Sequence, residues 1–489
     1  MSTAPNRIVV IGQDAPLWLA ANVLRAALAP AGVTVEAVEL ASAAGASHVH
    51  VTQPALEALH NRLGIAEQRL LRATRGSYSL GQRFIDASGV VPPFFHGHGA
   101  IGRPIAGMEF LPFWLKARAH GLAAGLDDFS LTAAAALHGR VLQPDGETER
   151  FGRTDYGYHL PAAAYARSLR TLAMQDGIAM HEAARLSVER DAGGRIAALR
   201  LDADRLVPGD LFIDASRDGI LGNDAGWQRW RDAFPADRVL HARGPRMRSV
   251  PPYGQVIATD WGWASLHPSA EKTHVVAAFS AATAEEKVFD SLPSLCGFVP
   301  REVAFEASSP GQQAEPWQGN CLAIGPAAAR FDPVHGVDLL ALQLGLVHLI
   351  ARVPVDAEGA AERCDYNRIV PQLFAHLADF QAAHYRLARY AGLFWETARS
   401  GAASPDLSHR IATFAARGLI APYEHESFAP ESWQALLLGH GVVPDRWSPS
   451  IDRVAPERMR AEFREMLGFI RDKVLAQPEH DRLLAGLAA

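Results

Sequence analysis

The sequence is poor in cysteine, in net charge and in long apolar runs. Its 489 residues include only three cysteines, Cys296, Cys321 and Cys364, which are too few and too scattered for a disulfide scaffold or a thiolate metal cage. The 47 Lys and Arg residues nearly balance the 53 Asp and Glu residues, so the net charge is −6. This weakly acidic balance argues against nucleic acid or an anionic membrane surface as a partner.

Segments of the kind that direct export or span a membrane are also missing. Near the start, only residues 8–11 form an apolar run, and a signal peptide needs a longer core. The most apolar later stretch, residues 337–350, contains Asp338, Gln343 and His348 and is too short to cross a bilayer. We therefore expect a cytoplasmic protein with no membrane partner.

What the chain does contain is the composition of an ordinary globular protein. Hydrophobic residues make up 48% of the sequence and charged residues 20%, which argues against disorder. At roughly 150 residues per domain, the length corresponds to about three domain equivalents. The chain is therefore long enough to bury a sizeable core.

The N-terminal segment predicts a strand, a turn and a helix. Residues 8–11 are a β-branched run, Gly12 follows, and apolar residues then recur at helical spacing as far as Leu28. A second strand is expected at residues 33–38, ending at Glu39. This order is the first half of a nucleotide-binding βαβ unit, in which an acid after the second strand binds a ribose.

The glycine pattern of this turn is incomplete, and two alternatives stay open. A GxGxxG motif would place glycines at the positions held by Asp14 and Leu17. The middle glycine normally lets the backbone approach a pyrophosphate, and a carboxylate there would repel one. The turn is either a dinucleotide-binding loop of altered chemistry or an inherited turn that no longer binds.

The remaining pattern predicts an α/β fold with a helical C-terminal part. Alternating strands flank a hairpin turn at residues 191–194, and further apolar strands end at Asp214 and Gly325. A helix is expected over residues 337–352. Beyond residue 370 the apolar residues follow helical spacing, and Pro456 opens a helix with one apolar face.

Eight longer segments carry more specific information. In chain order they are TQPALEALHNRLGIAEQRLLRATRGSYSLGQRF, FFHGHGAIG, YGYHLPAAAYARSLR, DLFIDAS, DWGWASLHP, GNCLAIGPAAARFDPVHGVDLL, CDYNRIVPQLFAHLADFQAAHYRLARYAGLFW and GHGVVPDRW. These segments resemble, in the same order, those of the flavin-dependent tryptophan halogenases. Trp261 and Trp263 match the family's tryptophan-rich signature, and Ser265 and Leu266 replace its Ile-Pro pair. Because the two tryptophans lie two residues apart, we expect them to share one face of a strand and to pack in the core.

The resemblance implies a fold, a cofactor and a kind of substrate. The fold is an FAD-dependent monooxygenase-like (p-hydroxybenzoate hydroxylase-type) α/β body, with interleaved FAD-binding and substrate-binding parts over residues 1–370 and a helical part over residues 371–489 that closes the substrate pocket. The implied cofactor is FAD, reduced by a partner flavin reductase. The implied substrate is a small, tryptophan-like aromatic molecule, and the expected assembly is a homodimer or a hetero-oligomer.

The family's binding residues carry over to named positions of this chain. Residues that resemble the family's substrate-binding residues are His96, His98 (where the family has Phe) and Trp395, and in the family they hold an aromatic ring between them. Residues that resemble the cofactor-binding ones are Gly12, Gln13, Ala15, Glu39, Gly325, Asp332 and Pro333.

The family's catalytic residues are replaced. In the family, hypochlorous acid made from chloride reaches an essential lysine, whose position is held here by Ser79, and a hydroxyl cannot form a chloramine. A supporting glutamate is replaced by His335, and two small hydroxyl residues that help to place the halide are replaced by Gly336 and Val337. An acid near the flavin is replaced by His50. His335 is either a general base near neutral pH or a polar pocket residue.

These departures argue against halogenation by the family's route and leave two hypotheses. The first is an enzyme that uses FAD to oxidise or oxygenate an aromatic substrate, with Ser79 and His335 at the catalytic positions. The second is a non-catalytic relative, a binding or partner subunit with weakened or lost flavin binding. The altered glycine turn favours the second, whereas Glu39, His96 and Trp395 favour a retained ligand site.

Two His-x-His pairs raise a third hypothesis, a metal site. His48 with His50, and His96 with His98, would each face one side of a strand and could bind a metal ion. No carboxylate or cysteine lies at a supporting spacing, and the matching family positions are not ligands. We therefore expect no metal.

Overall fold

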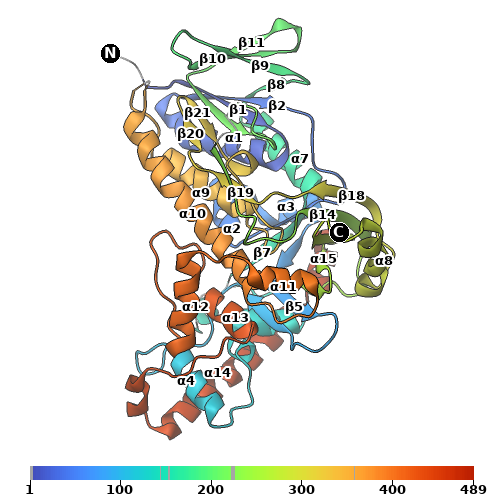
Figure 1. The fold of residues 1–489 in the computed structure, drawn as a ribbon, viewed down its shortest axis with the longest axis vertical. Helices are drawn as coiled ribbons and strands as arrows, with labels where there is room; N and C mark the ends of the chain where they lie inside the picture. The colour runs from blue at the N-terminus through green and yellow to red at the C-terminus, as the bar shows by residue number, and fades with distance from the viewer. Residues whose placement is uncertain (1–3, 144, 152–154, 222–225, 357, 489) are drawn as a thin grey trace. The chain divides into compact units, whose positions relative to one another are not determined.

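The chain forms two compact units, and each combines three segments that are distant in the sequence (Figure 1). The computed structural model describes residues 4–143, 145–151, 155–221, 226–356 and 358–488. The first unit contains residues 1–75, 160–231 and 309–378, and the second contains residues 76–159, 232–308 and 379–489. The boundary expected at residues 370–371 falls within helix α10 (Ala360–Arg386), where the chain passes from one unit to the other without a break.

A six-stranded sheet forms the centre of the first unit. The strand order is β20 (Trp317–Gln318), β21 (Cys321–Ala323), β12 (Leu211–Ala215), β1 (Arg7–Gly12), β2 (Thr34–Glu39) and β8 (Ala179–Glu182). All neighbours run parallel except β20 and β21. Because a parallel sheet is covered on both faces, its central strand β1 is a continuous apolar run. The predicted strands are confirmed.

Helices of the same unit pack beside this sheet. Helix α1 (Asp14–Leu28) contacts β1, β2, α7 (Ala162–Gln175) and α9 (Asp338–Ile350). The buried amide of Asn22 in α1 donates to the carbonyl oxygens of Trp18 and Leu169, at 2.8 and 2.9 Å, and so joins α1 to α7. Helix α9 confirms the helix predicted after the strand that ends near Gly325. Two further helices are α2 (Ala55–Arg62) and α3 (Glu67–Thr74).

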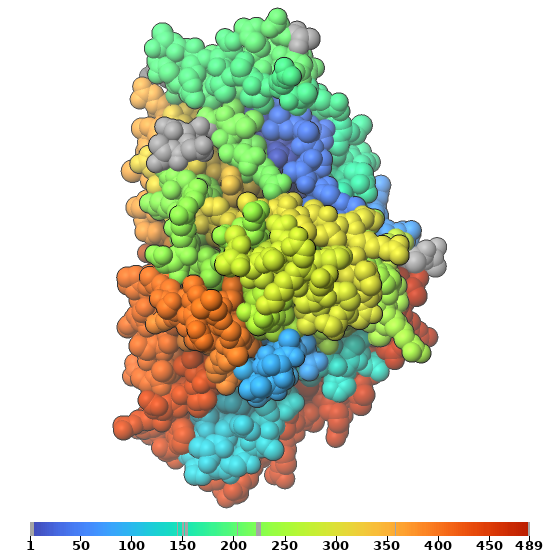
Figure 2. Space-filling model, turned by 45° about the vertical axis from the view of Figure 1, so that its right-hand side comes forward, coloured from blue at the N-terminus to red at the C-terminus, as the bar shows by residue number. Residues whose placement is uncertain are grey.

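Short strands complete the first unit. The predicted hairpin is confirmed as β9 (Leu186–Arg190) and β10 (Ile196–Leu201), which pair antiparallel and continue into β11 (Leu206–Pro208). Apolar side chains of this small sheet share one buried cluster with those of β1 and β12. Its outer surface is green in Figure 2. The other strands are β3 (Val49–Val51), β13 (Trp227–Arg229), β19 (Gly311–Gln313) and β22 (Ala329–Arg330).

A seven-stranded sheet forms the centre of the second unit. Its order is β18 (Arg301–Ala307), β14 (Arg238–Pro245), β17 (Lys272–Phe279), β16 (Gly262–Pro268), β15 (Gly254–Thr259), β5 (Gly81–Asp86) and β6 (Phe94–Gly97). Only β15 and β5 pair in parallel. Helix α8 (Glu285–Cys296) buries Val288 and Leu292 in one cluster with the side chains of this sheet. A separate pair is β4 (Ser77–Ser79) with β7 (Gly157–Pro161).

The second unit also contains the helical C-terminal part, coloured orange and red in Figure 1. Helix α14 (Pro456–Ala476) confirms the helix predicted to open at Pro456, and it buries Phe463, Met466, Ile470 and Val474 along one face. The other helices are α4 (Phe110–Ala119), α5 (Leu131–Leu137), α6 (Gly146–Phe151), α11 (Leu393–Ser400), α12 (Pro405–Arg417), α13 (Pro430–Gly439) and α15 (His480–Ala488). Among the described helices, none is long and apolar enough to cross a membrane.

Several imidazoles of the second unit are buried and uncharged at neutral pH. Burial lowers the pKa of His159 and of His440 to about 3, and that of His480 to about 4. The Nδ1 atom of His159 donates to the carbonyl oxygen of Pro268 at 2.9 Å. Below pH 6.5 the unfolded chain therefore binds more protons at these positions than the folded chain does.

We expect the free energy of unfolding to fall as the pH drops from 6.5 toward 4. A single imidazole with a folded-state pKa of about 3, as for His159, accounts for about 2 kcal/mol of this loss between pH 7 and pH 5. His159→Asn keeps a donor for Pro268 and removes one titrating group, so urea titrations should show a smaller loss. An equal loss in His159→Asn and the unchanged protein would contradict this assignment.

Candidate functional site

The turn between β1 and α1 lies at the carboxyl edge of the first unit's sheet. Gly12 ends β1 and is paired in parallel register with Glu39 of β2 and Ala215 of β12. A Cβ atom at Gly12 would lie 2.6 Å from the carbonyl oxygen of Ala215, so no side chain fits there. The carboxyl edge of a parallel sheet is also where α/β proteins bind ligands.

The residues after Gly12 start helix α1. Gln13 is the N-cap residue, but its side chain does not cap the helix. Its Oε1 atom is buried and accepts no hydrogen bond from the residues that the structure describes. Ala15 is buried, and the following Pro16 has no backbone N–H to offer. The orphaned amide of Gln13 is therefore a polar group that a molecule bound at this helix end could satisfy.

Asp14, at the position of the missing glycine, is engaged by the loop after β2. Its φ of 55° is in the left-handed region, which few residues other than glycine adopt. Its carboxylate accepts hydrogen bonds from the Ser42 hydroxyl at 2.6 Å and from the backbone N–H groups of Ala43 and Ala44 at 2.9 and 3.0 Å. The carboxylate thus ties residues 42–44 to the start of α1, a role that the motif comparison did not reveal.

Glu39 lies beside Gly12 at the end of β2, as predicted. Its Oε2 atom accepts a hydrogen bond from Arg170 Nε of α7 at 2.9 Å, and Arg170 also forms an ion pair with Glu182 at 3.0 Å. The guanidinium lies 5.7 Å from the centre of the Trp18 ring. The side chain of Glu39 is 23% exposed. Glu39 therefore has a fixed orientation, and the sequence had not indicated its partner Arg170.

The second predicted cofactor loop follows β21. Gly325 has a φ of 54° and begins a 3₁₀ turn, and the half-buried Pro333 follows Asp332. Asp332 is buried and accepts a hydrogen bond from the backbone N–H of Val334 at 3.0 Å. At the start of α9, Asp338 is accessible to solvent, yet desolvation by the surrounding chain, and secondarily Asp332, raises its pKa to about 6.

His335 and Gly336 form the left-handed turn before α9. Their φ angles are 67° and 57°. His335 is 1% exposed, and its carbonyl oxygen accepts a hydrogen bond from Gln53 Nε2 at 2.7 Å. A Cβ atom at Gly336 would lie 2.5 Å from the carbonyl oxygen of Val51, so this backbone cannot carry a hydroxyl side chain there. Any side chain at position 336 would therefore require the backbone to move.

Ser79 ends β4 in the second unit. It is fully buried, and its hydroxyl donates to the carbonyl oxygen of Gly81 at 3.3 Å. A serine nucleophile needs a base to accept that proton. Its hydrogen instead goes to a carbonyl oxygen, which is not a base, so Ser79 is not prepared for nucleophilic attack.

The shortage of lysine excludes a displaced catalytic amine. The sequence contains only four lysines. Three form ion pairs with acidic side chains and the fourth is exposed at the start of β17; in that order they are Lys116, Lys287, Lys473 and Lys272. No lysine of the chain is therefore a buried, unpaired amine.

His96 and His98 lie at the end of β6, in the second unit, and both are buried. Their rings meet edge to face at 6.3 Å, and the ring of His96 also contacts Phe380 at 5.4 Å and Phe428 at 6.5 Å. Burial lowers the pKa of His96 to about 4, so this imidazole is neutral at pH 7. A neutral imidazole among phenyl rings suits a planar aromatic ligand. The sequence had not indicated Phe380 or Phe428.

Trp395 belongs to the same network of aromatic rings of the second unit as His96, and Trp263, His384 and Phe380 join the two. It is fully buried on α11, and its Nε1 donates to the carbonyl oxygen of Thr259 at 2.5 Å. Its ring meets Trp263 edge to face at 4.7 Å and Tyr390 at 4.9 Å.

The expectation that Trp261 and Trp263 share one face of a strand is wrong. Trp261 precedes β16 and lies in the turn from β15, so the alternation of a strand does not apply to the pair. Trp261 packs in the cluster that contains Phe279 and Leu292. Both rings are 2% exposed, which is consistent with core packing.

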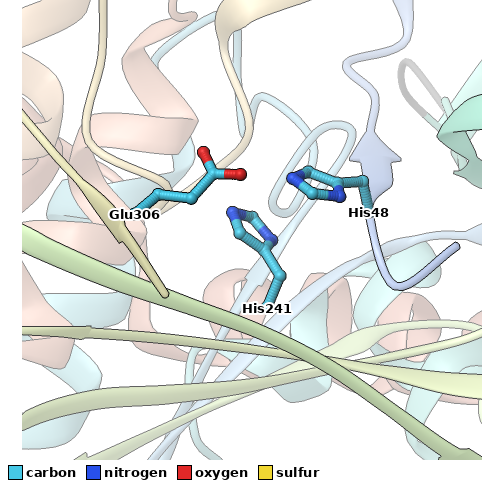
Figure 3. A group of neighbouring side chains, drawn as sticks. All are labelled: His48, His241 and Glu306. Atoms are coloured by element: carbon cyan, nitrogen blue, oxygen red, sulfur yellow. The ribbon is translucent and has the colours of Figure 1, made fainter. Parts of the chain in front are cut away.

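The His-x-His pairs do not assemble a metal site within either unit. In the first unit, the Nδ1 atom of His48 accepts a hydrogen bond from the backbone N–H of Gly45 at 3.0 Å. In the second unit, Figure 3 shows His241 of β14 beside Glu306 of β18, with ligand atoms within 4.8 Å of each other. Two protein ligands are fewer than a zinc site requires. The third side chain labelled there, His48, belongs to the first unit.

Comparison with known proteins agrees with the resemblance found in the sequence. The family model described as tryptophan halogenase matches residues 7–456. The tryptophan 6-halogenase SttH of Streptomyces toxytricini is 25% identical over 97% of this chain and 98% of its own length. BrvH, a flavin-dependent halogenase from Brevundimonas sp. BAL3, has a TM-score of 0.93 at 29% identity, with 99% of each chain covered.

A second solved structure agrees. Xcc4156, a flavin-dependent halogenase from Xanthomonas campestris, has a TM-score of 0.93 at 26% identity and covers 99% of this chain and 98% of its own. The fold predicted from the resemblance, an FAD-dependent monooxygenase-like body with a helical C-terminal part, is confirmed. On the match over residues 7–456, this chain belongs to the tryptophan halogenase family.

Proposed function

We propose that the chain is a flavin-dependent enzyme that acts on a small aromatic molecule and receives reduced FAD from a separate flavin reductase. Its relatives BrvH and Xcc4156 are flavin-dependent halogenases. In this chain, the unpaired amide oxygen of Gln13 beside the turn at Gly12 supports a bound cofactor that offers a hydrogen-bond donor there. The neutral imidazole of His96 among phenyl rings supports an aromatic substrate.

The proposed cofactor site uses the two loops of the first unit. The N–H groups at the start of α1 would bind the diphosphate of FAD, and the Glu39 carboxylate would accept a hydrogen bond from the ribose. Bound FAD in its reduced form supplies the electrons that activate oxygen. The residues that would hold it are Gly12, Gln13, Ala15, Glu39, Gly325, Asp332 and Pro333.

We propose oxidation or oxygenation of the substrate rather than halogenation. The observation that carries this choice is Ser79, whose buried hydroxyl is bound to a carbonyl oxygen in a chain with only four lysines. A hydroxyl can neither form a chloramine nor donate as an ammonium group does. The buried imidazole of His335 is the proposed proton acceptor, because a neutral imidazole carries a basic ring nitrogen.

A second candidate function is a non-catalytic binding or partner subunit. Asp14 favours it, because a carboxylate replaces a glycine at the expected diphosphate site and is held there by residues 42–44. A cytoplasmic location and a homodimer or hetero-oligomer are further expectations from the sequence.

Flavin binding and product analysis distinguish these functions. Calorimetry with oxidised and with reduced FAD should detect binding, and turnover of indole with a flavin reductase and oxygen should give an oxidised or oxygenated product at the same rate with or without chloride. Binding of neither form of FAD would support the non-catalytic function. A chlorinated or brominated product would overturn the choice of oxidation and restore the family's activity.

The double variant Ser79→Lys/His335→Glu should not chlorinate indole. A lysine at position 79 would be fully buried, which lowers its pKa, and a glutamate at position 335 would have to adopt a φ of 67°. Gly336 would still exclude the family's hydroxyl side chain. Product analysis by mass spectrometry, with the two single variants as controls, checks this. Chlorinated indole from the double variant, with none from either single variant, would contradict this prediction.

Asp14→Asn should strengthen FAD binding about fivefold, because it removes a negative charge beside the proposed diphosphate site. The amide keeps an oxygen that can accept hydrogen bonds from residues 42–44. Calorimetry at low and high salt should show that the gain shrinks as salt screens the charge. Asp210→Asn is the matched control, because Asp210 also accepts two backbone hydrogen bonds but at the first residues of β1. If Asp14→Asn and Asp210→Asn change FAD binding equally, the assignment of the diphosphate site to the start of α1 is refuted.

A further inference from the structure

A buried ion pair lies close to the aromatic residues around His96 in the second unit. The Arg410 side chain, on α12, is 3% exposed, and its Nη2 donates to Glu426 Oε2 at 2.6 Å. The guanidinium carbon lies 4.1 Å from the ring centre of Trp433 and 4.7 Å from that of Tyr423. Two aromatic faces and one carboxylate thus hold this cation in one orientation.

Glu426 transmits this orientation to the backbone of the next two residues. Its other carboxylate oxygen, Oε1, accepts hydrogen bonds from the backbone N–H groups of Ser427 and Phe428, both at 3.0 Å. The Tyr423 hydroxyl donates to the carbonyl oxygen of Asp406 at 3.1 Å, which ties the same loop to the start of α12. The backbone at Phe428 is therefore set by the ion pair and not by packing alone.

Phe428 lies directly beside the ring of His96. Its own ring is stacked on Phe380, with centres 3.7 Å apart and planes inclined by 13°. Phe380 meets Trp433 edge to face at 4.9 Å, and Trp433 is the ring on which the Arg410 guanidinium lies. The rings of both Phe380 and Phe428 contact His96. A change in the loop at 426–428 would therefore change the aromatic surface next to His96.

Stability does not by itself require this ion pair. Replacing a buried ion pair with apolar side chains of similar size is often neutral or stabilising, whereas breaking it by removing one partner is costly. Here both carboxylate oxygens of Glu426 accept hydrogen bonds, one from Arg410 and the other from the backbone of residues 427 and 428. A role in positioning Phe428 explains why an ion pair is present and why its carboxylate also binds this backbone.

We propose that Arg410 and Glu426 form a clamp that positions Phe428, and that the Phe428–Phe380 stack determines which planar aromatic substrates fit beside His96. The proposal rests on the proposed function, because it takes His96 as part of the substrate site. Arg410 and Glu426 are positioning residues that act through Phe428, and Phe428 is the specificity residue. The expected ligands are uncharged fused rings such as indole.

The test measures binding of indole and of tryptophan in the absence of flavin, by calorimetry on the full chain. Glu426→Gln and Phe428→Leu should each weaken indole binding about threefold to tenfold, as expected for a displaced aromatic contact. The double variant should bind no more weakly than Phe428→Leu alone, because Glu426 acts through Phe428. In turnover the same variants should raise KM and leave kcat within about twofold.

A surface ion pair of the same unit provides the control. Asp452→Asn removes the partner of Lys116, a pair with a 2.7 Å contact and a carboxylate that is 57% exposed, and should leave indole binding unchanged. If Glu426→Gln does not fold, Arg410→Lys, which keeps the charge and loses the planar fork, tests the same coupling. If the double variant loses as much indole-binding free energy as the sum of the losses in Glu426→Gln and Phe428→Leu, the clamp is overturned. A lower melting temperature with unchanged indole binding would overturn it too.

The experiment also separates this proposal from the proposed function. Indole binding without any flavin-dependent turnover would overturn the proposed function and leave the clamp standing. If the unchanged protein binds neither indole nor tryptophan, the clamp is overturned together with the aromatic substrate class.

Discussion

The close approach of the backbone at the end of β1 is the constraint on which the first unit's site depends. Gly12 lies so near the carbonyl oxygen of Ala215 that no side chain fits between β1 and β12. Because β2 runs parallel to β1, the same register brings Glu39 to that edge. Helix α1 starts two residues after Gly12, at Asp14, and the Asp14 carboxylate ties residues 42–44 to the first turn of the helix. The close packing of β1 against β12 thus places the turn at Gly12, the Glu39 carboxylate and residues 42–44 at one edge of the sheet.

At the predicted catalytic positions, the backbone constrains this chain as well as the side chains do. Gly336 is pressed against the carbonyl oxygen of Val51, and His335 adopts a left-handed conformation beside it. Ser79 gives its hydroxyl hydrogen to a neighbouring carbonyl oxygen. The chain therefore has the fold of the family, and the local structure at Ser79 and His335 is the basis on which we propose a different reaction.

Local patterns in the sequence were sufficient for most of the fold. The β-branched run before Gly12, the alternating strands around residues 191–194 and the apolar face after Pro456 each predicted the element that the structure contains. The prediction was wrong for Trp261, because a residue in a turn does not follow the alternation of the strand after it. Side chains alternate between two faces only along a continuous strand. The sequence does not show at which residue a strand begins or ends.

The sequence by itself determined the family and the strand–turn–helix at Gly12, because these depend on residue identity and spacing alone. The replacement of the family's lysine by Ser79 and of its glutamate by His335 stays a prediction. Only the tertiary structure decided the direction of each side chain. It engaged Asp14 with residues 42–44, paired Glu39 with Arg170, and joined Trp395 to His96 through intermediate aromatic rings. Hydrogen bonds between residues about 30 to 130 positions apart oriented Asp14 and Glu39, and such partners are set by the packing of the whole unit rather than by any local pattern.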